Sequence, residues 1–153
     1  MSANWPKATL RPSTAMQIST ATESDMIDVI ALWEVCDLTR PWNDPVTDYR
    51  LALANETSAI LLAHEEGELV ASVMTGFDGH RGWVYYLAVA PDARKQALGR
   101  TMMTAAEQWL DDREAPKVQL MVRGDNEQAI GFYKALGYEI QPVMTLGRKL
   151  NGT

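Results

Sequence analysis

A short basic segment joins an apolar run, residues 83–90, to a strongly periodic helix predicted from residue 98. It reads Arg94-Lys95-Gln96-Ala97-Leu98-Gly99-Arg100 and places three cations in a chain of net charge −6. The first N–H groups of a helix lack backbone acceptors and carry partial positive charge, so this turn suits an anion such as a pyrophosphate. Small residues at 97 and 99 let a ligand approach the backbone. An ordinary turn with solvated basic side chains explains the segment equally well.

A second group of polar side chains lies further along the chain. Asn126 and Tyr133 are seven residues apart, so on a helix they lie within about 20° of one another. One helix face then presents an amide and a phenol. Asn126 also fits a helix N-cap, and Tyr133 also lies on the apolar stripe, where a core tyrosine would be. From the residues alone, these structural interpretations are favoured.

The elements that position these groups follow from hydrophobic periodicity. Apolar residues recur at helical spacing from Leu98 to Leu110, and further helices are predicted at 23–38, 46–55 and around 129–136. Strands are predicted at 16–20, 59–64, 69–77, 83–90, 118–122, 138–140 and 143–150. Strands first follow one another and then alternate with helices, which indicates an α/β (α+β) fold with a mixed sheet and helices on both faces. We expect one domain, residues 16–151, after an N-terminal extension, residues 1–15.

Composition limits the partners. The chain is 46% hydrophobic with a net charge of −6, and its pI of about 4.9 argues against a nucleic-acid-binding surface. The acidic charge suits a cationic substrate, although it is also common in bacterial proteins. Cys36 is the single cysteine, so no intrachain disulfide forms and a cytoplasmic location is expected. No apolar run reaches the ~18 residues of a membrane span, so no membrane partner is expected; no metal site is expected either.

Taken together, the segments resemble the GNAT superfamily of acetyltransferases, and within it the small bacterial YpeA-type members. The resemblance covers roughly residues 16–150. The family's pyrophosphate motif, Arg/Gln-x-x-Gly-x-Gly/Ala, is matched from Arg94 to Gly99 except at Ala97. The second motif, Asn-x-x-Ala-x-x-x-Tyr-x-x-x-Gly-Tyr/Phe, is matched throughout by Asn126, Ala129, Tyr133, Gly137 and Tyr138. Residues 37–45 and 78–82 resemble the YpeA subgroup.

Ala97 stands where this family usually has glycine. If the position requires a positive φ, the alanine methyl strains the backbone. If the helix has already begun at residue 97, alanine is harmless and even favours the helix. The second alternative is the one we expect.

The resemblance implies a six- to seven-stranded, mostly antiparallel sheet in which strand 84–90 splays from strand 118–122. Acetyl-CoA is the implied co-substrate, with its pantetheine arm in that gap and paired with the backbone of Leu87 and Val89. The amides of residues 95–100 would hold the pyrophosphate. The cofactor-binding residues implied are Leu87, Ala88, Val89, Arg94, Lys95, Gln96, Ala97, Leu98, Gly99, Arg100, Asn126 and Tyr133.

The implied chemistry is direct attack of an amine on the thioester. The amine must be neutral, which for a lysine-like pKa of about 10.4 costs about 4.6 kcal/mol at pH 7, so a base or a water chain must remove a proton. No carboxylate lies in residues 83–90, and the base is left among Tyr85, Tyr86, His80 and water. Tyr85 and Tyr86 alternate across the strand, so only one is expected to face the cleft. Tyr133 is the expected catalytic acid, and a backbone N–H near Leu87 or Ala88 would stabilise the oxyanion.

The acceptor is expected to be a primary amine of a small molecule, a peptide N-terminus or a lysine. The expected substrate-binding residues are Trp42, Asp44 and Tyr85, although Trp42 fits a loop anchor equally well. A homodimer is possible. Two other functions stay open: a non-catalytic acetyl-CoA-binding sensor or interaction module with the same fold, and a structural interaction protein without a cofactor.

Overall fold

The computed structural model describes residues 16–150, and for residues 94–96 it describes the backbone without the side chains. The predicted extension, residues 1–15, therefore lies outside the described residues. The described residues form two compact units, a first unit up to Met121 and a second unit from Val122. No helix in residues 16–150 is both long enough and apolar enough to cross a membrane.

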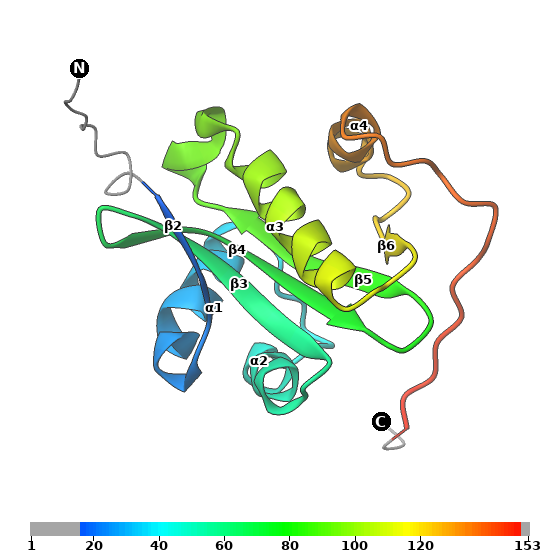
Figure 1. The fold of residues 1–153 in the computed structure, drawn as a ribbon, viewed down its shortest axis with the longest axis horizontal. Coiled ribbons are helices and arrows are strands. Elements are labelled where there is room, and N and C mark those ends of the chain that lie inside the picture. Colours follow the sequence, from blue (N-terminus) through cyan, green and yellow to red (C-terminus); the bar gives the residue numbers. More distant parts are fainter. Residues whose placement is uncertain (1–15, 151–153) are drawn as a thin grey trace. The chain divides into compact units, whose positions relative to one another are not determined.

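A five-stranded sheet forms the centre of the first unit (Figure 1). Its strand order is β2-β3-β4-β5-β6, where β2 to β5 pair antiparallel and β6 pairs parallel with β5. The strands are β2 (Gln17–Thr20), β3 (Ser58–Glu65), β4 (Glu68–Phe77), β5 (Gly82–Val89) and β6 (Val118–Leu120). The β6 ladder reaches only the first three residues of β5.

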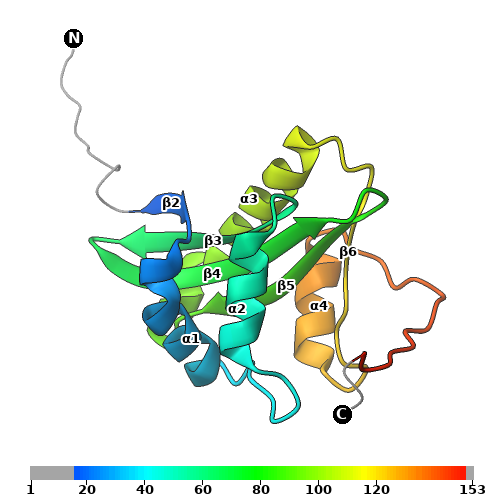
Figure 2. The same ribbon diagram turned by 90° about the horizontal axis from the view of Figure 1, so that it is seen from below.

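Helices cover both faces of this sheet, as predicted. The short 3-10 helix η2 (Glu23–Asp25) leads into α1 (Met26–Val35), and α1 and α2 (Pro45–Ala54) lie on one face. The long helix α3 (Leu98–Asp112) lies on the other face, and the two views show the three layers (Figures 1 and 2). A further 3-10 helix, η3 (Pro91–Gln96), links β5 to α3, and α4 (Glu127–Ala135) belongs to the second unit.

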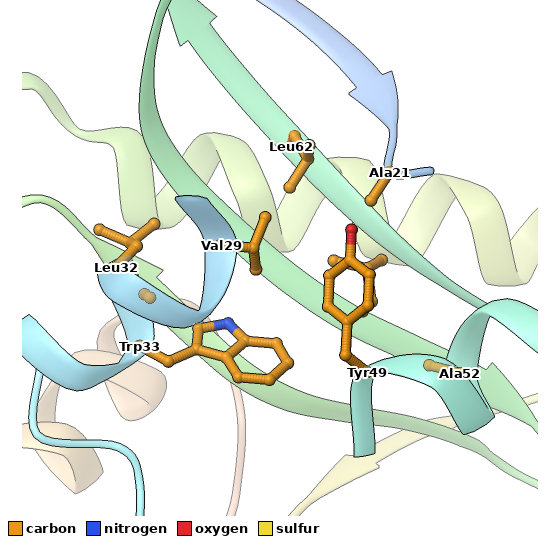
Figure 3. Packing of buried hydrophobic residues seen from close by; sticks show 9 residues of the cluster. Ala21, Val29, Leu32, Trp33, Tyr49, Ala52 and Leu62 are labelled. Carbon is orange, nitrogen blue, oxygen red and sulfur yellow. The ribbon is translucent and has the colours of Figure 1, made fainter. Parts of the chain in front are cut away.

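Two aromatic residues dominate the core between α1, α2 and the sheet (Figure 3). Trp33 and Tyr49 are fully buried, with ring centroids 6.0 Å apart. Their polar ends are satisfied, because Trp33 Nε1 donates to Ser72 Oγ at 3.1 Å and Tyr49 OH donates to the Thr22 carbonyl at 2.6 Å. A buried polar group without a partner would cost stability, so these bonds fix where both helices dock.

The prediction of six to seven strands is wrong. The expected strands at 138–140 and 143–150 do not form: these residues are described without strand pairing. Their apolar side chains, which suggested strands, lie on the surface of their unit, where Val143 and Met144 are 73% and 89% exposed. A strand needs a hydrogen-bonded neighbour, and the described part of the second unit supplies none.

Candidate functional site

The turn before α3 is not helical at Ala97. This residue has φ 58° and ψ 26°, which is the left-handed region, and it is the N-cap residue of α3. The expectation that the helix has already begun at residue 97 is therefore wrong. Because a left-handed conformation strains any residue with a Cβ, glycine would fit this position better than the alanine present.

The basic segment is folded around the start of α3. Arg94, Lys95 and Gln96 form the last residues of η3. Leu98 is the first residue of α3 and is 2% exposed, whereas Arg100 is exposed. The burial of Leu98 anchors the first turn, whose N–H groups have no intrahelical partner. A helix of 15 residues presents a full positive dipole end here, so the turn has the properties that a pyrophosphate requires.

The pairing of strand β5 with β4 is irregular next to the expected pantetheine-binding residues. Met74 pairs with Tyr85 and Ser72 pairs with Ala88, so three steps along β5 oppose two steps along β4. The extra residue forms a β-bulge, and Tyr86 within it adopts a positive φ of 53°. Beyond the bulge, Leu87, Ala88 and Val89 resume the strand, with Ala88 buried.

The bulge changes which side chains share a face. Regular alternation would send Tyr85 and Tyr86 to opposite faces, but both line one cavity of about 550 Å³. The expectation that only one of them faces a cleft is therefore wrong. The cavity lies in the first unit, between α2, the chain before it, and strands β4 and β5. It is lined by Leu38, Asn43, Asp48, Leu51, Ala52, Asn55, Ser58, Met74, Thr75, Gly76, Tyr85 and Tyr86.

Tyr86 is held on two sides. Its ring stacks on Trp33 with centroids 3.9 Å apart, and its hydroxyl donates to Asp48 Oδ2 at 2.7 Å. Burial, together with the hydrogen bond and the charge of Asp48, raises the pKa of Tyr86 well above its usual value. Tyr86 therefore stays protonated near neutral pH and acts as a hydrogen-bond donor, which makes it a poor general base.

The other expected acceptor residues have different surroundings. Asp44 is the N-cap of α2, where its carboxylate accepts from Val46 N at 3.1 Å and from the Thr47 hydroxyl at 2.8 Å. These hydrogen bonds, that of Thr47 first, lower the pKa of Asp44. Trp42 is 57% exposed, and neither it nor Asp44 lines the cavity, whereas Tyr85 does. A substrate role for Trp42 and Asp44 stays a prediction.

His80 lies in the turn between β4 and β5. Its backbone N–H and that of Arg81 both donate to Asp78 Oδ1, at 2.8 and 2.7 Å, and Trp83 Nε1 donates to Asp78 Oδ2 at 3.2 Å. The backbone donors lower the pKa of Asp78. His80 itself is exposed, so its described contacts are those of a turn residue.

The second unit carries the amide and the phenol. Asn126 is the N-cap of α4, and its Oδ1 accepts from Ala129 N at 3.1 Å. Tyr133 has edge-on contacts with Phe132 and Tyr138, at centroid distances of 5.0 and 5.8 Å. Burial raises the pKa of Tyr133 to about 12. A phenol with this pKa is fully protonated at neutral pH and has a proton to donate.

Comparison with known proteins defines the class of the fold. The aminoglycoside N-acetyltransferase AAC(6')-Iy, solved in complex with CoA, superposes with a TM-score of 0.75 at 15% identity, over 88% of this chain and 95% of that one. A putative acetyltransferase from Agrobacterium tumefaciens superposes with a TM-score of 0.73 at 18% identity, over 87% and 99% of the two chains. The fold is therefore that of this group of acetyltransferases.

The sequence comparisons go further. Residues 27–138 match the acetyltransferase (GNAT) family. An acetyltransferase from Pectobacterium atrosepticum is 45% identical over 135 residues, which is 88% of this chain and 96% of that protein. One from Yersinia enterocolitica is 44% identical with the same coverage. The chain belongs to the GNAT family, and the predicted enzyme class, an N-acetyltransferase with acetyl-CoA as co-substrate, is confirmed. The YpeA subgroup stays a prediction.

Sequence reasoning missed two features of the site. The sequence places Asp48 only within a predicted helix, because its contact with Tyr86 spans 38 residues of sequence. The bulge at Tyr86 was missed because an apolar strand carries no signal for one extra residue. The one signal in the sequence is the absence of a carboxylate from residues 83–90, which leaves any carboxylate of the site to another element.

Proposed function

We propose that this enzyme transfers the acetyl group of acetyl-CoA to the primary amine of a small molecule or a peptide by direct attack. The observation that carries the proposal is the order β5, basic turn, α3, followed by Asn126 and Tyr133 on one later helix, in a chain of the GNAT family. The aminoglycoside N-acetyltransferases of the same fold are named for small-molecule amine acceptors, which supports this acceptor class here.

The residues are assigned as follows. The amides of residues 95–100 bind the pyrophosphate, aided by the dipole of α3. The backbone of β5 at Leu87 and Val89, beyond the three residues that pair with β6, binds the pantetheine arm. A backbone N–H at Leu87 or Ala88 donates to the oxyanion. Asn126 contacts the cofactor in addition to capping α4.

The bond changes balance without another reactant. The neutral amine nitrogen forms a bond to the thioester carbonyl carbon, and the C–S bond breaks with its electron pair leaving on sulfur. The thiolate then takes a proton from the Tyr133 hydroxyl. The nitrogen of the new amide loses its extra proton to water. Water in turn returns a proton to the Tyr133 phenolate.

Replacement of Tyr133 by phenylalanine tests the enzyme against a non-catalytic acetyl-CoA-binding module. Tyr133→Phe keeps the ring contacts with Phe132 and Tyr138 and removes only the hydroxyl, so we expect turnover to fall about 100-fold with acetyl-CoA affinity intact. Turnover is followed by release of free CoA over a panel of amines and peptides. Unchanged turnover would remove Tyr133 from the acid role, and no CoA release with any acceptor would favour the module.

Acetyl-CoA binding is tested separately by thermal shift. Ligand at about 100 times its Kd stabilises the folded state by about 2.7 kcal/mol, so a clear rise in melting temperature is expected. An unchanged melting temperature at millimolar acetyl-CoA would contradict the cofactor assignment and favour a purely structural protein.

A further inference from the structure

The cavity beside β5 has one feature that the assigned chemistry does not use. Among the described residues that line it, Asp48 is the only charged one; the others are apolar, aromatic or neutral polar, the last being Asn43, Asn55, Ser58 and Thr75. A carboxylate on an otherwise largely apolar wall favours a cationic ligand group, because it is desolvated more than a surface carboxylate would be.

The contacts of the Asp48 carboxylate with its own fold involve one oxygen and no cation among the described residues. Its Oδ2 accepts from Tyr86, and no ion pair joins it to a cation among the described residues, where the paired carboxylates are those of Asp37, Glu23 and Asp125. By contrast, the nearby Asp44 has both carboxylate oxygens occupied by the cap of α2. Asp48 is half-buried, and the carboxylate oxygen that does not bind Tyr86 is left for a ligand.

The distance of Asp48 from β5 determines which ligand group it meets. The Tyr86 phenol extends from the bulge to Asp48, so a whole tyrosine side chain and a 2.7 Å hydrogen bond separate the carboxylate from the strand backbone. In the proposed function the thioester lies along that backbone at Leu87. The reacting nitrogen must lie close to the thioester carbon, and Asp48 is displaced from it across the cavity.

Energetics lead to the same assignment. A carboxylate next to the reacting amine would stabilise its protonated form, which cannot attack, and would add to the cost of deprotonation. A carboxylate bound to a different group of the acceptor adds binding energy and leaves the reacting amine free to lose its proton.

We infer that Asp48 selects acceptors that carry a second positive charge besides the reacting amine, and that it binds this second cation while Tyr86 holds the carboxylate in position. The inference rests on the proposed function, since it takes the thioester to lie on β5. The acceptor class is therefore a diamine or a basic peptide, with an apolar portion between the two charges that packs on Leu38, Leu51 and Met74. Tyr86 is a positioning residue in this scheme.

The role of Asp48 is tested with matched acceptors that differ by one positive charge. Cadaverine is compared with pentylamine, and lysinamide with norleucinamide, by steady-state kinetics with acetyl-CoA. We expect the doubly charged member of each pair to have a kcat/KM about tenfold higher or more, mainly through KM, as for a hydrogen bond to a charged group. Asp48→Asn keeps an acceptor for the Tyr86 hydroxyl and removes the charge. In this variant the two members of each pair should have similar kcat/KM values.

Two further variants separate charge from structure. Asp28→Asn removes an exposed carboxylate of α1 that does not line the cavity, and it should keep the preference in full. Tyr86→Phe keeps the stacked ring and removes the hydroxyl, so KM for the doubly charged acceptor should rise several-fold while KM for acetyl-CoA stays the same. This split would not arise from a general loss of folding.

The outcomes distinguish the two proposals. Acetylation without a preference for the second charge, or a preference that survives Asp48→Asn, would overturn this inference and leave the proposed function standing. Absence of CoA release with every amine would instead overturn the proposed function, and this inference with it.

Discussion

Two regions of the first unit each hold a non-glycine residue in the left-handed conformation, and they are supported differently. Tyr86, in the bulge of β5, has a stacked ring on one side and a hydrogen bond on the other. Ala97, before α3, has an exposed methyl group that can make no comparable contact. Strain of this kind persists only where surrounding structure imposes it. The bulge is held by the contacts of its own side chain, whereas the turn is held by the two helices that flank it, η3 and α3.

Tyr86→Gly gives the largest expected effect. Glycine relieves the backbone strain of about 1–2 kcal/mol, but loss of the half-buried ring, which packs against the core, costs up to about 3–5 kcal/mol. We expect the free energy of unfolding to fall by about 1–4 kcal/mol, measured by urea denaturation. Tyr85→Gly, which removes an exposed ring from the same strand, serves as the control and should cost less. An increase in stability with Tyr86→Gly would show that the bulge does not depend on its side chain.

The buried phenols give an intermediate effect that depends on pH. Burial, followed by the charges of Asp25 and Glu23, raises the pKa of Tyr49 from 10.0 to about 12. The unfolded chain therefore loses this proton first, so the stabilisation is fully present below pH 10 and is lost as pH rises towards 12. We expect a decline of up to about 2 kcal/mol across this window.

Tyr49→Phe checks that decline. Urea denaturation at several alkaline pH values should show a flatter pH dependence for the variant, although its stability at pH 7 falls by about 1 kcal/mol through loss of the hydrogen bond to Thr22. Substitutions at Ala97 should leave the pH dependence as it is, since the turn contains no buried phenol. If the free energy of unfolding of Tyr49→Phe declines as steeply at alkaline pH, the decline arises from other groups.

Ala97→Gly gives the smallest expected change in stability. Relief of the left-handed strain of about 1–2 kcal/mol is offset by about 0.4–1 kcal/mol of added chain entropy in the unfolded state, so we expect a net gain of about 0–1.5 kcal/mol. Calorimetric titration should show acetyl-CoA binding about threefold tighter, because a ligand approaches a glycine backbone more closely. Ala97→Val is the matched control and should lose stability, because β-branched residues tolerate a positive φ poorly. Weaker binding by the glycine variant would indicate that the alanine methyl contacts the ligand.

Sequence reasoning succeeded where the signal was local. The periodic stripe of α3 and the N-cap of α4 at Asn126 follow from spacing and cap chemistry, and the structure has both. It failed where the outcome depends on distant partners. The apolar residues from Val143 onward read as a strand because their pattern is right, but pairing requires a neighbour that the pattern cannot supply.

The candidate site shows the same division. The turn at Ala97 was located correctly, but its conformation depends on how η3 delivers the chain to α3 and cannot be read from seven residues. The pairing of Asp48 with Tyr86 depends on where α2 docks against β5, which the core around Trp33 determines. The sequence motifs thus locate the residues that we propose for the cofactor, whereas the pairing of Asp48 with Tyr86 is created by packing.

The order of strands in the sheet has a consequence for how the enzyme is assembled during folding. Strands β3, β4 and β5 are joined by short connections, whereas β2 and β6 reach their partners only after closure of long intervening loops. Short-range pairing is kinetically favoured, so the three central strands should gain protection before the two outer ones. Pulse-labelling hydrogen exchange during refolding would show this, and protection of β6 as early as that of β4 would contradict it. In this order of events the pairing of β4 with β5, including the bulge at Tyr86, forms before β6 adds to the other edge of β5.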